Sequence, residues 1–220
     1  MKVAVVLSGC GVFDGSEIHE SVITILELCK NGAEIEFLAP DIDQKRVVNH
    51  LTSEETSETR NVLVESARIA RGKIRPLGKA KATNYDAIIF PGGFGAALNL
   101  CDYGVKGSEC DVNPDVERFI VEGFENGIPL GFICIAPALA ARTLGRRATG
   151  LKVTIGNDPK VAEDIRKMGA SHVECKVDDC VVDTDNKVVT TPAYMLAQNI
   201  SEAAAGIGKL VREVLELAKK

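Results

Sequence analysis

The residue in this sequence most suited to chemistry is Cys134. It follows an apolar run over residues 129–133, which is typical of a buried strand, and precedes residues 135–141, which open a helix. A side chain at such a strand-to-helix turn stands above the sheet on a strained backbone. Because the positive end of the helix stabilises an anion, we expect the Cys134 thiol to be more acidic than the ordinary value of about 8.5. A buried cysteine that packs as a small hydrophobic residue is the alternative, and Phe132 and Ala136 stand where a nucleophile elbow has glycines.

A glycine-rich segment, Pro91-Gly92-Gly93-Phe94-Gly95, follows directly after the apolar run 87–90 and is a candidate source of backbone N–H donors. Adjacent glycines let backbone N–H groups approach a ligand closely. We expect the N–H groups of Gly93 and Ile135 to face a developing oxyanion beside Cys134. A tight turn that needs glycine only for its dihedral angles is the alternative.

Two carboxylates near the start of the predicted helix 17–31 are candidates for proton transfer. Glu17 and Glu20 are three residues apart, so they occupy neighbouring positions on one face. Glu17 also complements the helix dipole without any role in chemistry. Periodicity predicts a solvated Glu20, because a polar and an apolar stripe run along opposite sides of the helix. The polar stripe holds Glu20, Thr24, Glu27 and Asn31, and the apolar stripe holds Ile18, Val22, Ile25 and Cys29.

Residues 8–15 come close to a dinucleotide-binding fingerprint but do not match it. Asp14 stands where the third glycine belongs, and an anion there disfavours a pyrophosphate. The sequence contains no Walker A motif. We therefore expect no nucleotide and no other organic cofactor.

The remaining reactive residue types carry weaker signals. His19, His50 and His172 lie away from Cys134 in the sequence, so none is nominated as its partner. Among the other cysteines, Cys10 is the one placed near the end of a predicted strand.

Composition limits the class of protein. The chain has 220 residues, of which 45% are hydrophobic and 26% charged, as in ordinary folded domains. Its net charge of -5 argues against nucleic acid as a partner. No apolar run approaches the roughly 20 residues that span a bilayer, and residues 1–7 fit a buried strand better than a signal peptide. Seven cysteines without zinc-type spacing predict free thiols, no metal site and a reducing, cytoplasmic location.

Short apolar runs alternate with helical patterns along the chain. Runs without strict polar alternation are typical of parallel strands buried on both faces. The predicted strands are 3–7, 35–39, 87–90 and 130–134, the predicted helices about 17–31, 57–71, 114–126, 135–144, 160–168 and 201–218, and a hairpin covers 180–191. This order predicts a single α/β domain over residues 1–220, a three-layer sandwich with a mostly parallel central sheet. Ligands bind such sheets beyond the carboxyl ends of the strands.

Long literal matches around these sites indicate a family. The chain resembles the ElbB (enhancing lycopene biosynthesis) family of the ThiJ/PfpI, class I glutamine amidotransferase-like superfamily. The matches run in order along nearly the whole chain. They are LSGCGVFDGSEIHE at 7–20, TRNVL at 59–63, PGGFGAA at 91–97, GFICIAPA at 131–138 and TTPAYMLAQNI at 190–200.

The resemblance implies a flavodoxin-like fold, a nucleophilic Cys134 and a carboxylate that hydrogen-bonds its thiol. It points to Glu20 for that carboxylate and to Glu17 as the second choice. ElbB-like proteins are associated with a cofactor-free, glutathione-independent glyoxalase activity that converts glyoxal, a small dicarbonyl, to glycolate. Removal of glyoxal from its adducts with other molecules, a deglycase activity, would also be measured as glyoxalase activity. The resemblance also implies a homodimer, for which apolar residues of the first helix, including Ile23, are candidates.

One departure from the superfamily pattern limits the chemistry. Many members have a histidine directly after the nucleophile, and Ile135 stands there in this chain, which argues against a Cys–His–carboxylate triad and against a glutaminase. As a hypothesis, Cys134 adds to one carbonyl of glyoxal, backbone N–H groups hold the oxyanion, Glu20 moves a proton between the two carbons, and water releases glycolate. The alternative is a non-catalytic redox sensor or binding module, because an acidic, exposed thiol is also readily oxidised.

Overall fold

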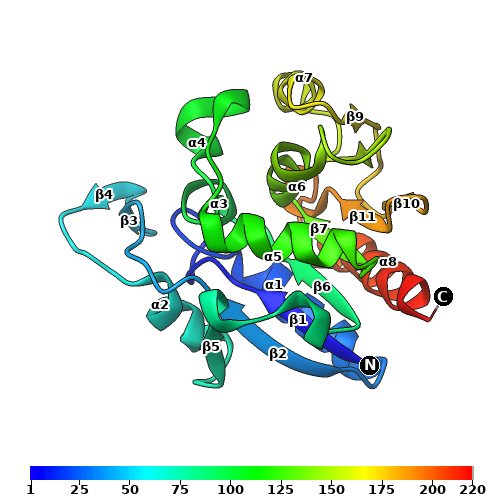
Figure 1. The fold of residues 1–220 in the computed structure, drawn as a ribbon. Coiled ribbons are helices and arrows are strands. Elements are labelled where there is room, and N and C mark those ends of the chain that lie inside the picture. Colours follow the sequence, from blue (N-terminus) through cyan, green and yellow to red (C-terminus); the bar gives the residue numbers. More distant parts are fainter. Residues whose placement is uncertain (220) are drawn as a thin grey trace.

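A seven-stranded sheet forms the centre of the structure, a computed structural model that describes residues 1–219 (Figure 1). The strand order is β10-β11-β7-β6-β1-β2-β5, and only β10 runs antiparallel to its neighbour. These strands are β1 (Lys2–Val6), β2 (Glu34–Ala39), β5 (Ile74–Pro76), β6 (Ala87–Phe90), β7 (Leu130–Ile133), β10 (Val181–Asp183) and β11 (Val188–Thr191). The flavodoxin-like α/β fold with a mostly parallel sheet is therefore confirmed.

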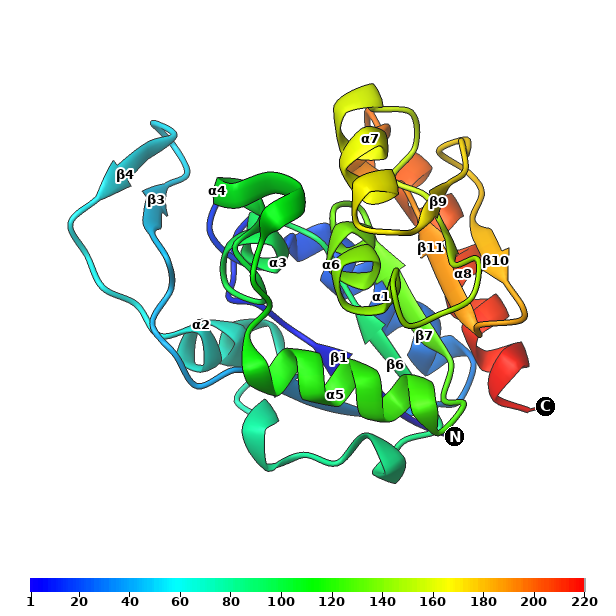
Figure 2. The same cartoon turned by 45° about the horizontal axis from the view of Figure 1, so that its top comes forward.

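Helices cover both faces of this sheet (Figures 1 and 2). Helices α5 (Pro114–Glu125) and α6 (Ala136–Leu144) pack on one face, and α1 (Ile18–Lys30), α2 (Val62–Ile69) and α8 (Ile200–Ala218) pack on the other. The other α-helices are α3 (Phe94–Leu98), α4 (Tyr103–Lys106) and α7 (Pro159–Lys167). Two short outlying strands, β8 (Lys152–Val153) and β9 (Ser171–His172), pair with each other.

Burial on both faces explains the apolar runs in the sequence. In β1, Val3 and Val5 point into the core beneath α1 and α8, whereas Ala4 and Val6 point into the core beneath α5 and α6. Strand β6 is buried at every position and has the bounds that the sequence predicts. Each strand thus brings its carboxyl end to the same edge, where the loops that carry the candidate residues meet.

Helix boundaries follow capping residues that the sequence contains. Asn113 and Asp158 accept hydrogen bonds from the first turns of α5 and α7, each before a proline. Gly32 and Gly127 have φ angles of 71° and 67° just beyond α1 and α5. The helix predicted over residues 57–71 is shorter than expected, because Asn61 caps it and α2 begins only at Val62.

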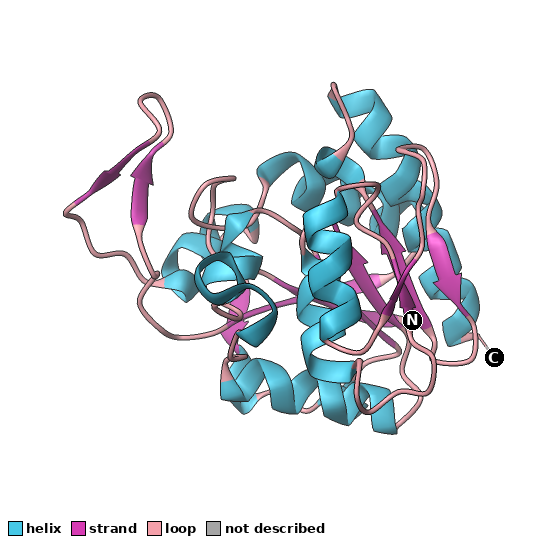
Figure 3. Ribbon diagram, turned by 90° about the horizontal axis from the view of Figure 1, so that it is seen from above, coloured by secondary structure: helices cyan, strands magenta, loops and turns pink. Residues whose placement is uncertain are grey.

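Earlier in the chain, a hairpin of β3 (Val47–Asn49) and β4 (Glu54–Thr56) projects away from the sheet (Figure 3). Asp14 holds its base, because its buried Oδ2 accepts a hydrogen bond of 2.8 Å from the Val48 N–H. The residue that spoils the dinucleotide fingerprint therefore has a structural partner of its own.

Helix α1 has the opposite orientation from the one that its periodicity predicts. Glu20 and Thr24, on the predicted solvated stripe, are fully buried. Ile18, Val22 and Leu26 are between 44% and 51% exposed. Ser21 and Thr24 hydroxyls bond to backbone carbonyls one turn earlier, while Ile23 and Leu28 fill the core. The stripe prediction was wrong, because periodicity separates polar from apolar sides without saying which of them faces inward.

None of the helices within residues 1–219 combines the length and hydropathy that a membrane-spanning helix needs.

Candidate active site

Cys134 occupies the turn between β7 and α6, as predicted. Its φ angle is 63°, in the left-handed region that non-glycine residues rarely adopt. The Cys134 N–H donates to the carbonyl of Thr191 over 2.9 Å, which ties the turn to the end of the neighbouring strand β11. Such strain is retained where the surroundings fix the backbone, and it commonly marks a functional position.

The Glu20 carboxylate lies directly against this thiol. Glu20 is fully buried and is hydrogen-bonded to the Cys134 side chain. Its Oε2 accepts from the Gly92 N–H over 2.9 Å, and its Oε1 accepts from the Tyr194 N–H over 3.3 Å. Three segments far from α1 in the sequence therefore contact one carboxyl group.

Gly92 and Gly93 are required at this junction for steric reasons. A Cβ on Gly92 would lie 2.5 Å from the Cys134 Cβ and 2.6 Å from the Glu20 Oε2. Gly93 has a φ angle of 90°, and a Cβ there would lie 2.3 Å from the Glu17 nitrogen. The glycines are therefore needed both for the dihedral angles of a tight turn and for the close approach of the backbone to Cys134 and Glu20.

Burial controls the ionisation of the pair. It raises the pKa of Glu20 to about 8, with the nearby Glu17 carboxylate adding to the effect. Burial also raises the pKa of the Cys134 thiol well above its usual range, and the Glu20 carboxylate raises it further. Hydrogen bonds from the backbone of Gly93 and Ile135 lower the pKa of that thiol but do not offset burial.

The expectation of an unusually acidic Cys134 was therefore wrong. The amides at the start of α6 act in the predicted direction, yet removal of water from the sulfur outweighs them. At neutral pH both members of the pair hold their protons. The Glu20 carboxyl group, hydrogen-bonded to the Cys134 side chain, is the group next to the S–H proton.

The two predicted amides converge on the sulfur. Gly93 and Ile135 both hydrogen-bond the Cys134 side chain through their backbone. An oxyanion on a carbon bonded to this sulfur would form within reach of the same donors. The structure thus brings Cys134, Glu20, Gly93 and Ile135 together.

Glu17 has a different position. Its carboxylate caps α1 and accepts from the Glu20 N–H over 2.6 Å, and its own N–H donates to the Gly92 carbonyl. It also lines the pocket next to Cys134. Glu17 therefore holds the Glu20 backbone and places a carboxylate near the site. The carboxyl group hydrogen-bonded to the Cys134 thiol is that of Glu20.

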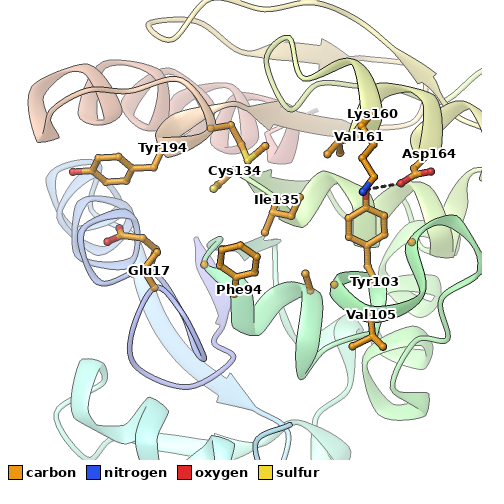
Figure 4. Close-up of a pocket in the computed structure, with 16 residues that line it drawn as sticks. Glu17, Phe94, Tyr103, Val105, Cys134, Ile135, Lys160, Val161, Asp164 and Tyr194 are labelled. Atoms are coloured by element: carbon orange, nitrogen blue, oxygen red, sulfur yellow. Dashed lines mark hydrogen bonds between the residues drawn. The ribbon is translucent and has the colours of Figure 1, made fainter. Parts of the chain in front are cut away.

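A pocket of about 420 Å³ opens from Cys134 (Figure 4). Tyr194 and Glu17 lie to one side of the thiol, and Tyr103, Val105 and Lys160 lie toward the other end. No residue of the segment 102–111 was named from the sequence, and most of this wall was therefore missed. Tyr194 lies within one of the literal family matches and Phe94 within the glycine segment, and both could have been nominated on that ground.

The histidines and the other cysteines take other positions. His19 bonds through Nδ1 to the Tyr194 hydroxyl over 2.8 Å, at the flank of the site. His50 stacks on Phe13 beside the projecting hairpin. None of the pocket-lining residues in the described chain is a histidine. Burial and the nearby Glu65 raise the pKa of Cys10, so this thiol is less reactive than its place near a strand end suggests.

Within residues 1–219, no three His, Cys, Asp or Glu side chains gather so as to hold a metal ion.

Known proteins resemble the chain along its whole length. A human protein named glutamine amidotransferase-like class 1 domain-containing protein 3, mitochondrial, is 47% identical over all of this chain and 84% of its own. The chain belongs to this amidotransferase-like, ES1/ElbB family. An Ehrlichia chaffeensis isoprenoid biosynthesis protein with an amidotransferase-like domain has the same fold, with a TM-score of 0.93, 34% identity and 99% of each chain covered. No family model matches the chain.

More distant structures share the fold alone. The DJ-1 protein of Schizosaccharomyces pombe superimposes with a TM-score of 0.59 at 19% identity, over all of this chain and 97% of its own. This likeness agrees with the ThiJ/PfpI architecture expected from the sequence.

The predicted cytoplasmic location is contradicted by the relatives. The human protein and two ES1 relatives, from rat and zebrafish, are named mitochondrial proteins. Free thiols and a missing leader pattern had suggested the cytoplasm, but reduced thiols do not distinguish that compartment from others that keep thiols reduced.

Proposed function

We propose that this ES1/ElbB-family protein is a cofactor-independent glyoxalase that converts glyoxal to glycolate. The observation that carries the proposal is the buried contact between the Cys134 thiol and the Glu20 carboxyl group, with the Gly93 and Ile135 backbone at the same sulfur. A nucleophile, an acid–base group and two oxyanion donors are together sufficient for an internal redox reaction of a dicarbonyl.

The reaction begins with sulfur attack. Ionised Glu20 takes the S–H proton as the Cys134 sulfur bonds to one aldehyde carbon, and the Gly93 and Ile135 N–H groups hold the resulting oxyanion. That oxygen takes up the proton from Glu20, which gives a hemithioacetal and restores the carboxylate.

Glu20 then moves a second proton. It removes the hydrogen from the carbon bonded to sulfur, which gives an enediol, and delivers a proton to the neighbouring carbon. The product is a glycolyl thioester on Cys134. Water cleaves the thioester, so that glyoxal and water yield glycolate and one proton, and the thiol is regenerated. No electrons leave the substrate, so no external oxidant is needed.

A glutaminase reaction is less well supported despite the family's name. Glutamine hydrolysis by a cysteine nucleophile uses a histidine to activate the thiol and protonate ammonia. Ile135 follows Cys134, and the pocket walls within the described chain carry no histidine. Glu20 is the group positioned for proton transfer.

A redox sensor remains the second candidate, and one contact favours it. A protonated Glu20 would donate a hydrogen bond to an oxidised Cys134 sulfur. The raised pKa of the thiol opposes this role, because thiolate is the form that peroxide oxidises.

Turnover separates the two candidates. We expect purified protein to release glycolate from glyoxal, measured by chromatography, and Cys134→Ser to abolish this activity. The matched control is Cys180→Ser, at a half-buried cysteine remote from the pocket. Full activity in Cys134→Ser would contradict the mechanism, and no turnover in the parent would favour the sensor.

We also propose a homodimer that uses the outer face of α1. Ile18, Val22 and Leu26 are spaced four residues apart and form an exposed apolar stripe on the helix that holds Glu20. Contiguous exposed apolar residues commonly mark a protein interface. Ile23, named for this role from the sequence, is only 6% exposed and belongs to the core instead.

A further inference from the structure

The pocket beside Cys134 is much larger than glyoxal requires. Its volume of about 420 Å³ lies within the range of roughly 300–1,000 Å³ that encloses drug-sized ligands. Glyoxal consists of two adjoining aldehyde groups and would occupy only the end next to the sulfur. The remaining volume needs an explanation in terms of the substrate's other end.

Apolar side chains form most of the wall beyond the thiol. Phe94 and Val105 are 47% and 64% exposed, which is unusual for large hydrophobic residues, and both line the pocket. Val12, Val161 and Met195 extend this lining. An apolar ligand body would cover these side chains and gain free energy in proportion to the area removed from water.

The wall is fixed before any ligand binds. The Tyr103 hydroxyl donates to the Asp164 Oδ2 over 3.0 Å, which ties α4 to α7 across the far end of the pocket. The Asp102 N–H donates to the Asp111 carbonyl and closes the loop that carries Val105. A preformed apolar wall binds a rigid substituent without the entropic cost of ordering a loop.

Charge at the far end is balanced rather than selective. Lys160 and Asp164 both line it, and they carry opposite charges. Asp164 is already engaged by Tyr103. Neither an anionic nor a cationic tail is therefore favoured by these side chains as strongly as an apolar one.

From this wall we infer that the pocket is built for an α-oxoaldehyde with an apolar substituent, such as an aryl or branched alkyl group, rather than for glyoxal itself. The inference rests on the proposed glyoxalase reaction at Cys134. The aldehyde carbon bonds to the sulfur, Glu20 moves the proton from that carbon to the keto carbon, and water hydrolyses the thioester. An aryl glyoxal and water thus yield an aryl-substituted 2-hydroxy acid, without an external oxidant or reductant. Val105 and Phe94 would set the preference for the substituent.

Labelling measures pocket preference independently of turnover. Iodoacetamide and N-benzyl iodoacetamide carry the same reacting carbon, and peptide mass spectrometry reports alkylation of each cysteine. With Cys175, a half-buried thiol outside the pocket and outside α1, as the internal reference, we expect the benzyl reagent to be preferred at Cys134 by about tenfold, as for one apolar group in a hydrophobic pocket. Val105→Asn should lower this preference by about threefold or more. The matched control is Val64→Asn, on α2 and 61% exposed, which should leave it unchanged.

Turnover forms the second arm, with glyoxal and phenylglyoxal as substrates and glycolate and mandelate as products. We expect kcat/KM to be higher for phenylglyoxal, and Val105→Asn to lower the ratio of the two values by about threefold. Preference in both arms supports the inference.

The outcomes separate the inference from the proposed function. Benzyl preference without turnover of either dicarbonyl would support an apolar ligand while overturning the glyoxalase. Equal labelling by the two reagents, with no effect of Val105→Asn, would overturn the inference even if glyoxal were consumed. Faster labelling by N-carboxymethyl iodoacetamide than by the benzyl reagent would overturn it in favour of an anionic ligand near Lys160.

Discussion

The two faces of helix α1 differ in a way that reverses the ordinary rule for surface helices. The inner face carries Glu20 and Thr24, both fully buried, whereas the outer face exposes Ile18, Val22 and Leu26. Helices of soluble proteins normally bury the apolar stripe and solvate the polar one. The reversal indicates that each face answers a requirement other than the stability of the isolated chain. The inner face places Glu20 against the thiol, and we propose that the outer face meets a second subunit.

The inner face is expensive to maintain. A buried ionised carboxylate without partners is strongly unfavourable, and such groups take up a proton instead. Glu20 meets this constraint with the Gly92 and Tyr194 N–H groups, the Cys134 thiol and a pKa of about 8. This unfavourable burial of a carboxyl group occurs next to Cys134, whose backbone is strained. A structural role alone would be met at lower cost by an apolar side chain.

The largest expected effect is the loss of turnover in Glu20→Gln. Glutamine keeps the size of the side chain but cannot accept a proton, so we expect glyoxal turnover to fall by at least about 100-fold. Circular dichroism and thermal unfolding should show a folded protein. Glu27→Gln, two turns further along the same predicted stripe, is the matched control and should change turnover little.

Two results would break this assignment. If Glu20→Gln retains full activity while Glu17→Gln does not, the wrong carboxylate has been assigned to proton transfer. If neither change matters and Cys134→Ser is inactive, another group carries the proton.

The next effect is the pH dependence of the reaction. With the pKa of Glu20 raised to about 8, the carboxylate that takes the S–H proton is scarce at neutral pH. We expect kcat/KM for glyoxal to rise about tenfold per pH unit below pH 8 and to level off above it. A profile that is flat between pH 6 and about 8 would show that Glu20 is already ionised in the free protein.

Stability should carry the opposite pH dependence. The pKa of Glu20 is raised on folding from an ordinary 4.5 to about 8, so its contribution is fully present below pH 4.5 and is lost as pH rises through 8. We expect the free energy of unfolding of the parent to fall relative to Glu20→Gln across this window, by at most about 1.4 kcal/mol per pH unit. Urea denaturation of both proteins at several pH values measures the difference, and a constant difference would contradict the raised pKa.

The oligomeric state of the protein tests the proposed role of the outer face of α1. Val22→Lys places a charge in the middle of the apolar stripe, so we expect the parent to scatter light as a dimer at micromolar concentration and the variant as a monomer. Val64→Lys, at a similarly exposed valine on α2, should leave the dimer intact. A monomeric parent would remove the explanation offered for this face.

The comparison also shows which features a sequence can reveal. Local chemistry is visible in the order of residues, so the strand predicted over residues 87–90 and the turn predicted at Cys134 match the structure. Burial is a property of the assembled fold. The orientation of α1 therefore differed from expectation, since a helix with two distinct stripes fits a core either way until its neighbours are known.

The same distinction explains the thiol. The helix start after Cys134 is local, and its predicted influence is present in the Ile135 hydrogen bond. The desolvation that outweighs it arises from segments far away in the chain, among them Glu20 and Gly92. The wall formed by Tyr103 and Val105 was missed for a related reason, because nothing in residues 102–111 shows that they fold back over the strand ends.

The smallest effect on turnover is expected for a substitution of Glu17, the residue that caps the start of α1. Its carboxylate caps the helix through the Glu20 N–H, and the proposed mechanism gives it no part in proton transfer. Glu17→Gln keeps a weaker acceptor for that amide, so we expect a loss of stability of about 1 kcal/mol or less, within the range for N-cap replacement. Turnover should fall only several-fold, and the pH profile should shift toward lower pH, because removing the Glu17 charge eases the ionisation of Glu20. A shift toward higher pH, or a loss as large as that of Glu20→Gln, would place Glu17 in the chemistry itself.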